Sequence, residues 1–340
     1  MDRKKLILPV FFVLSSALII FFALELLVGG SHQKYVEERI RKELQKTPIY
    51  YLKTHKTGSS TLFNIIYRLA ITYNLKIGFP KYEKDNYICK HKPFEKDCIT
   101  QTSYEIIANH HVWSPVVDQV LPNATKITIL REPVSQIVSA FQYFGPRIFS
   151  VNGVPNEQSF EKFINATAPS SGKAAIRENT HNPMAFDLGL SAMYIYKSEE
   201  ELADWLVDYY DLVMITEYFD ESLILLKDLL SLEFSDIAYL KSNENSNSKK
   251  TFLSSDLSEK TKQQAYLLDR VDNALYKKAN ETFWEKIKLY GFEKMKQEKE
   301  AFRFYCAQID EDDYLMNFSE WEFIYFMRDY QKDENDKKEE

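Results

Sequence analysis

The sequence predicts an α/β protein with a mainly parallel central sheet flanked by helices. Two observations support this class. Four short apolar runs alternate along the chain with segments whose apolar residues recur at helical spacing. The composition, 45% apolar and 27% charged, is that of a globular chain. The length of 340 residues allows one large domain or two small ones.

The four apolar runs are short enough to be buried strands of a parallel sheet. They cover residues 49–52, 104–108, 126–130 and 212–215. Apolar residues at helical spacing predict helices between and after these runs. The predicted helices cover residues 62–73, a segment that begins at Pro133, residues 221–230 and the highly charged residues 258–300. Because strands alternate with helices, we expect helices on both faces of the sheet.

The N-terminal block differs from the rest of the chain. Leu6–Leu24 is 19 residues long without a charge, and the apolar stretch continues to Val28. It is long enough to span a membrane, and the basic residues before it predict a cytosolic N-terminus. We therefore expect a single-pass type II protein, with a cleavable signal peptide as the alternative. The expected parts are a cytosolic tail at 1–5, a transmembrane signal anchor at 6–28, a stem at 29–47 and a luminal body.

Cysteines and glycosylation sequons agree with a luminal body. The sequons, which are possible glycan acceptors, begin at Asn123, Asn165, Asn280 and Asn317. Cys89 and Cys98 are near enough to close a small disulfide loop in an oxidising lumen, which leaves Cys306 over. Three unpaired buried thiols are the alternative. The cysteine spacings do not resemble a zinc site, and we expect no metal.

The most informative segment joins the first predicted strand to the first predicted helix and reads KTHKTGSST. A helix N-terminus attracts anions, Gly58 lets the backbone approach a ligand closely, and Lys56 adds a positive charge. The candidate phosphate-binding residues are Lys53, Thr54, His55, Lys56, Thr57, Gly58, Ser59, Ser60 and Thr61. In the nucleoside-triphosphate P-loop the first glycine stands five residues before the second, and a lysine follows the second glycine. Here the first glycine is missing and Lys56 precedes Gly58, so a kinase or ATPase is disfavoured.

A second candidate phosphate-binding element follows the third predicted strand. Arg131 ends that strand, and Ser139 lies two turns into the helix that begins at Pro133. Two such elements indicate a nucleotide that is phosphorylated on both its 5′ and its 3′ side. The net charge of −7 argues against a strongly basic nucleic-acid-binding protein, so we expect no nucleic acid partner.

These motifs resemble the galactose-3-O-sulfotransferase family, whose members use 3′-phosphoadenylyl sulfate. The loop at 53–62 resembles the family's 5′-phosphosulfate loop, although the family often has alanine where Gly58 stands. Arg131 and Ser139 resemble its 3′-phosphate element. Further similar segments follow in the same order: Asn109-His110, FQYFGP at 141–146, FDLG at 186–189, EYFDES at 217–222 and LKDLL at 226–230.

The resemblance covers residues 48–300 and implies a P-loop-like sulfotransferase fold there. Residues 301–340 do not clearly follow the family pattern, and we interpret them as a C-terminal helical extension and charged tail. The family implies a Golgi membrane enzyme that sulfates galactose, at its 3-OH, in a glycolipid or glycoprotein glycan, without a metal. The alternative is a catalytically silent luminal glycoprotein that retains the fold. The oligomeric state is not predicted.

Sulfuryl transfer needs charge stabilisation on the leaving group and a base for the acceptor hydroxyl. We assign the first role to Lys56 and the second to His110, which follows the strand at 104–108. Parallel strands bring these residues to one sheet edge, and the family motifs imply the same roles. The alternative for His110 and His55 is a structural hydrogen bond, and we expect His111 to point away.

Two further features concern the acceptor side of the predicted site. The acidic residues Glu217, Asp220 and Glu221 could meet acceptor hydroxyls, but capping of the helix at 221–230 is the favoured interpretation. Acceptor pockets are commonly built from loops, so residues 76–103 and 146–185 are the candidate acceptor segments.

Overall fold

A computed structural model describes most of the chain that follows the N-terminal block. The described residues are 47–81, 87–90, 92–101, 103–149, 153–167, 176–240, 252–309, 324 and 326–327. They belong to one compact unit, Thr47–Glu340. The predicted cytosolic tail, the signal anchor and the stem up to residue 46 lie outside the described residues. None of the described helices has the length and apolar character that a membrane span requires.

The described chain contains a sheet of four parallel strands in the order β2-β1-β3-β4. The strands are β1 (Ile49–Leu52), β2 (Ile106–Asn109), β3 (Thr125–Leu130) and β4 (Leu212–Ile215). In the register, Leu52 lies opposite both Asn109 and Thr128. The predicted parallel sheet is confirmed, although β2 begins two residues later than predicted and β3 begins one residue earlier.

A helix of at least eleven residues follows each of three strands. These are α2 (Ser59–Tyr73) after β1, α4 (Pro133–Ile148) after β3 and α9 (Phe219–Leu229) after β4. The other α-helices of the described chain are α3 (Val116–Val120), α5 (Glu157–Thr167), α6 (Pro183–Asp187), α7 (Leu190–Met193), α8 (Glu199–Tyr209), α10 (Phe234–Ile237), α11 (Glu259–Leu268), α12 (Arg270–Tyr290) and α13 (Phe292–Cys306).

The helical segment predicted at 258–300 is divided into three helices. Asp269 leaves the helical conformation between α11 and α12. Gly291, with φ of +99°, separates α12 from α13, and glycine adopts such an angle without a side-chain clash. Helix α13 continues to Cys306, six residues past the predicted domain boundary.

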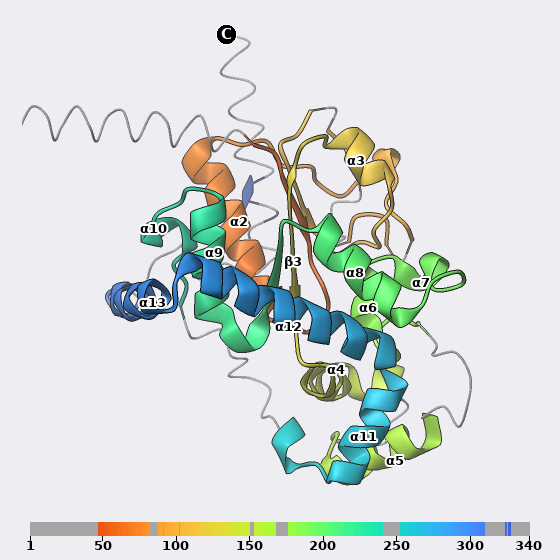
Figure 1. Ribbon diagram of the computed structural model, residues 1–340. Coiled ribbons are helices and arrows are strands. Elements are labelled where there is room, and N and C mark those ends of the chain that lie inside the picture. The colour runs from red at the N-terminus through yellow and green to blue at the C-terminus, as the bar shows by residue number, and fades with distance from the viewer. Residues whose placement is uncertain are drawn as a thin grey trace, which may run out of the picture. The chain divides into compact units, whose positions relative to one another are not determined.

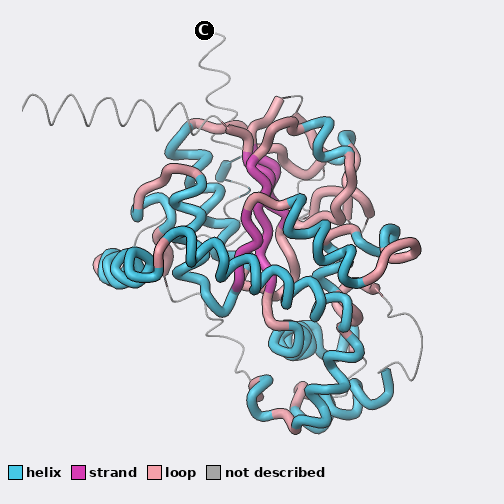
Figure 2. Tube along the Cα trace, in the orientation of Figure 1, coloured by secondary structure: helices cyan, strands magenta, loops and turns pink. Residues whose placement is uncertain are grey.

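Helices cover both faces of the sheet, as Figures 1 and 2 show. In Figure 1 the helices α2, α9 and α10 lie on one side, α3 and α8 lie on the other, and α12 crosses in front of the strands. The long helix α12 packs on α8 and on β4, while α2 packs on β2 and α10. The helix α4 lies below the sheet in this view, at the carboxyl end of β3.

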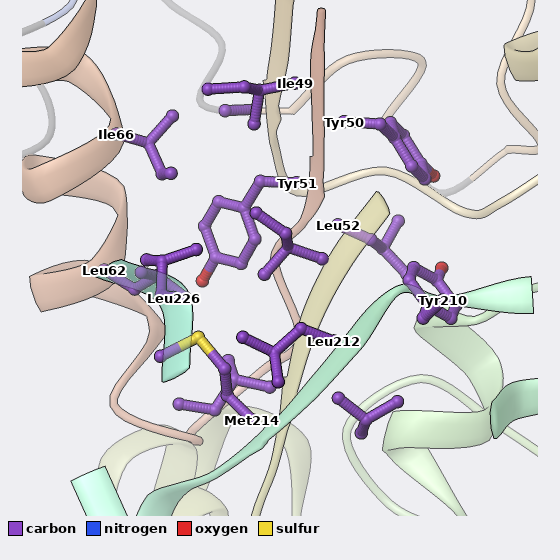
Figure 3. Packing of buried hydrophobic residues seen from close by; sticks show 14 of the residues in the cluster. Ile49, Tyr50, Tyr51, Leu52, Leu62, Ile66, Tyr210, Leu212, Met214 and Leu226 are labelled. Atoms are coloured by element: carbon purple, nitrogen blue, oxygen red, sulfur yellow. The ribbon is translucent and has the colours of Figure 1, made fainter. Parts of the chain in front are cut away.

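Strand β1 lies at the centre of the core, where its residues Ile49–Leu52 are at most 1% exposed. Successive side chains of a strand point to opposite faces. Tyr51 accordingly points toward Leu62 of α2, whereas Tyr50 points toward Tyr210 (Figure 3). A strand buried on both faces is apolar along its whole length, which explains why the run was recognisable in the sequence.

Cys89 and Cys98 form a disulfide, and Cys306 is free and half-buried. The prediction of a small disulfide loop is confirmed, and the alternative of three unpaired thiols is wrong. Isolated bridges pair Tyr87 with His110 and Pro93 with Val112, so the disulfide loop lies beside the segment that follows β2. Of the four sequons, the first two have exposed asparagines, the third asparagine is half-buried on α12, and the fourth lies outside the described residues.

Candidate active site

The candidate site lies where the strand order reverses, at the carboxyl ends of β1 and β3. Strand β2 pairs with one edge of β1, and β3 pairs with the other edge. In open parallel sheets, ligands bind at such a switch point. The loop Lys53–Gly58 leaves β1 here and Arg131 leaves β3, so the two predicted phosphate-binding elements are neighbours. A hydrogen bond of 3.2 Å from Arg131 Nη1 to the Lys56 carbonyl joins them.

The backbone carbonyls of residues 54–57 all accept hydrogen bonds from protein side chains. Ser59 Oγ donates to the Thr54 carbonyl over 2.7 Å, and Thr57 Oγ1 donates to it over 3.2 Å. Gln136 Nε2 donates to the His55 carbonyl over 2.9 Å, Arg131 donates to that of Lys56, and Thr216 Oγ1 donates to that of Thr57 over 2.6 Å. The loop is therefore held in one conformation by its carbonyl groups.

The N-terminus of α2 has no side-chain cap. Its N-cap residue, Gly58, has φ of +74°, a left-handed conformation that favours glycine. Because glycine has no side chain, it cannot cap the first turn. The first N–H groups of a helix lack partners within the helix and carry its positive partial charge. Gly58 and Ser60 are exposed and Thr61 is half-buried, so an anion can approach this turn.

Two lysines flank this turn in different surroundings. Lys53 is 1% exposed, and its Nζ lies 5.2 Å from the centre of the Phe63 ring. Lys56 is half-buried, has a positive φ of 60°, and its Nζ lies 3.7 Å from the centre of the exposed Tyr143 ring. Lys56 is therefore the more accessible charge beside the open helix end. Thr54 and Thr57 are buried and bond each other over 2.9 Å, which makes them parts of the loop framework.

His110 lies immediately beyond β2 and is 8% exposed. Its Nδ1 lies 2.9 Å from the Lys53 carbonyl, and because a carbonyl only accepts, Nδ1 carries the proton. The other ring nitrogen, Nε2, then has the lone pair that a base requires. Burial lowers the pKa of His110 well below 6.5, and the neighbouring His55, Lys53 and His111 lower it further. The imidazole is thus held neutral in the tautomer suited to accept a proton.

His55 lies beside His110, and its backbone N–H and both of its ring nitrogens contact other protein groups. Asp187 Oδ2 accepts from its backbone N–H over 2.8 Å, and both Asp187 oxygens lie 2.9 Å from its Nδ1. Its Nε2 lies 2.7 Å from the Tyr87 hydroxyl, and its ring stacks on His110 with centres 4.1 Å apart. The structure therefore favours the structural alternative for His55. The sequence alone indicates no role for Asp187, although this residue lies in the FDLG segment at 186–189.

His111 points to the other side of the sheet. Its Nε2 lies 2.8 Å from the Tyr50 hydroxyl and its ring lies beside Phe94, so the expectation that it points away from the site is confirmed. Burial lowers the pKa of His111 to about 3. Two adjacent histidines thus have different surroundings, because successive residues of an extended segment face opposite ways.

The second candidate phosphate-binding element consists of the side chains of Arg131 and Ser139. Arg131 is half-buried, and burial lowers the pKa of its guanidinium, which Glu217 and Glu132 oppose by their charge. The Glu132 carboxylate caps α4 by accepting from the backbone N–H groups of Val134 and Ser135 over 3.0 and 2.7 Å. Ser139 is half-buried on the same helix. Arg131, two residues before α4, and Ser139, on α4, remain candidates for a second phosphate, and a carboxylate already caps the N-terminus of that helix.

The predicted capping role of the acidic residues after β4 is wrong. The helix α9 begins at Phe219 without a side-chain cap. Asp220 instead accepts from Arg303 Nε over 2.5 Å, and Glu221 pairs with Lys299 over 2.6 Å. Glu217 accepts from the backbone N–H of Glu132 over 3.1 Å. These carboxylates bind partners on α13 and at the start of α4. The partners are distant in sequence, so a rule based on neighbouring residues does not predict them. No cluster of three metal-ligating side chains occurs among the described residues.

The chain is similar in sequence to known proteins over most of its length. The family model described as galactose-3-O-sulfotransferase matches residues 3–311. Bovine (Bos taurus) galactosylceramide sulfotransferase is 34% identical over 265 residues, which are 75% of this chain and 61% of that protein. Bovine galactose-3-O-sulfotransferase 3 is 29% identical over 252 residues, or 72% of this chain and 58% of that protein. The chain thus covers less than two thirds of these relatives' length. It belongs to the galactose-3-O-sulfotransferase family.

Proposed function

We propose that this protein transfers a sulfuryl group from 3′-phosphoadenylyl sulfate to a galactose hydroxyl, the 3-OH, in a glycolipid or glycoprotein glycan. The observation that carries the proposal is the uncapped N-terminus of α2, with Lys56 and His110 at the same sheet edge. An open helix end beside a lysine suits the 5′-phosphosulfate of the donor. Arg131, joined to the loop through the Lys56 carbonyl, suits its 3′-phosphate.

In the proposed reaction the acceptor oxygen attacks sulfur in line with the bond to the 5′-phosphate. The new S–O bond forms as the old one breaks, and the bond's electron pair leaves with the nucleoside bisphosphate. Lys56 and the first N–H groups of α2 stabilise the charge that grows on this leaving group. Nε2 of His110 takes the hydroxyl proton. No metal is assigned a role in this reaction.

The proposed location is the Golgi membrane, in single-pass type II orientation with the catalytic unit in the lumen. The uncharged run at 6–24 and the basic residues before it support this proposal. The disulfide between Cys89 and Cys98 fits an oxidising compartment. Protease treatment of intact vesicles should leave the catalytic unit whole, and its digestion would contradict the orientation.

Transfer of labelled sulfate from the donor to a panel of β-galactosides tests the function. We expect wild-type protein to sulfate galactose, and the His110→Ala variant to lose at least a hundredfold in kcat while still binding adenosine 3′,5′-bisphosphate. Retained binding shows that the variant is folded. If the wild type binds the bisphosphate and transfers sulfate to none of the acceptors, the silent-glycoprotein alternative holds instead.

A further inference from the structure

The Asp187 carboxylate fixes both the position and the tautomer of His55. It accepts from the His55 backbone N–H and from Nδ1, with all distances between 2.8 and 2.9 Å. Asp187 is 2% exposed and His55 is 6% exposed, so water competes little for these bonds. Because a carboxylate only accepts, the proton of His55 must lie on Nδ1. The ring cannot turn without breaking this pair of contacts.

The ring of His55 in turn forms the surface on which His110 rests. The two imidazoles stack with centres 4.1 Å apart and an interplanar angle of 18°. The Tyr87 ring, whose hydroxyl contacts His55 Nε2, stacks on His110 as well, at 5.3 Å. One hydrogen bond, to the Lys53 carbonyl, holds the His110 ring itself among the described residues. Stacking must therefore fix the rest of the ring's orientation, including the direction of Nε2.

Asp187 is itself held rigidly, because the helix that carries it is tied to α12. Asp272 accepts from the backbone N–H groups of Met184 and Ala185 over 3.0 and 2.7 Å. The side chain of Asn182 accepts from the backbone N–H groups of Val271 and Asp272 over 2.8 and 3.1 Å. These buried bonds connect α6 to the start of α12. The carboxylate of Asp187 thus has a fixed position from which to hold the loop after β1.

We infer that Asp187 is a positioning residue for the base His110 and that it acts through His55. The inference rests on the proposed function, since it assigns the orientation of the base in that reaction. Asp187 does not reach the reacting atoms: it holds His55, and His55 holds the plane of His110. Supporting groups of this kind matter because a base must lie within hydrogen-bond reach of the proton that it takes.

The Asp187→Asn variant tests this arrangement with little change of volume. An asparagine side chain has one accepting oxygen, and its NH2 group cannot accept from His55 Nδ1–H. We expect the His55 proton to move to Nε2 and kcat to fall at least tenfold, with the donor KM within threefold of wild type. In a His55→Gln background the same change should cost less than twofold, because non-additivity reveals a shared route.

Asp236→Asn is the matched control. Asp236 is a buried aspartate on α10 that, like Asp187, accepts from a backbone N–H, and it accepts from a tyrosine hydroxyl as well. Its kcat should stay within twofold of wild type. Equal losses from Asp187→Asn in both backgrounds would overturn the inference.

Nitrogen-15 spectra of the histidine rings test it without turnover. Unchanged His55 and His110 signals in Asp187→Asn would overturn it even if no acceptor is sulfated, whereas absent transfer with changed signals would count against the proposed function alone.

Discussion

Two helices leave the same sheet edge, and their N-termini differ in what they hold. The first turn of α2 has no side-chain cap and is preceded by a glycine in a left-handed conformation. The first turn of α4 is capped by the Glu132 carboxylate, which accepts from two backbone N–H groups. Both helices start after neighbouring strands, β1 and β3, so the difference does not come from their place in the fold.

Under the proposed function, the two helix ends are two different kinds of anion site. At α2 no side chain caps the helix end, and every carbonyl of residues 54–57 accepts a hydrogen bond from a side chain. At α4 a built-in carboxylate already uses the helix end, so an anion there depends on Arg131. We expect the α2 end to serve the reacting group, where charge develops, and the α4 end to serve binding.

The largest predicted effect is that of Lys56→Ala. Lys56 is the accessible charge at the open end of α2, and its interaction strengthens as the leaving group gains charge. We expect kcat/KM to fall more than a hundredfold, mainly through kcat, measured as transfer of labelled sulfate. Lys197→Ala, which removes a lysine from an exposed pair with Glu201, is the control and should stay near wild type. A loss confined to the donor KM would place Lys56 in binding only.

A smaller effect is predicted for Arg131→Ala. If the α4 end serves binding, the bisphosphate Kd should rise about tenfold, or ~1.4 kcal/mol, with kcat within threefold of wild type. Calorimetric titration measures the Kd. Arg270→Ala, which breaks a pair with Glu199 at the start of α12, supplies the control. A large fall in kcat with unchanged Kd would show that the two helix ends do not divide their roles in this way.

The features that could be predicted from the sequence are local ones. The strand at 49–52 is a continuous apolar run because both of its faces are buried. The candidate phosphate-binding loop is recognisable because glycine, lysine and hydroxyl residues stand together between a strand and a helix. The assignment of His110 as the base follows from its place after β2, where parallel topology brings strand ends together, and it stays a prediction.

The contacts that were missed join distant parts of the chain. Asp187 and His55 are 132 residues apart, and nothing in the neighbourhood of either residue indicates the partner. The same holds for Asp220, which a local rule assigns to a helix cap but which binds Arg303 on α13. The one sequence signal for Asp187 is its place in the FDLG segment, which resembles the family but by itself indicates no chemical role.

The smallest predicted effect is a weak pH dependence of activity, which distinguishes the buried His110 from a histidine base of ordinary pKa. Burial lowers the pKa of His110, so the neutral ring that accepts a proton persists below pH 6.5, and activity is lost only as the pH falls through that lowered value. A base of ordinary pKa, about 6.5, would lose roughly fourfold in activity between pH 7.5 and 6.0.

We therefore expect kcat/KM for the donor, which reports the free enzyme, to change less than about twofold over this range. Because a phosphate group also titrates near pH 6, the bisphosphate Kd measured at each pH supplies the correction. A corrected loss of fourfold or more would mean that His110 gains a proton as readily as an exposed histidine. The stacked and buried arrangement around His55 would then not describe the base in solution.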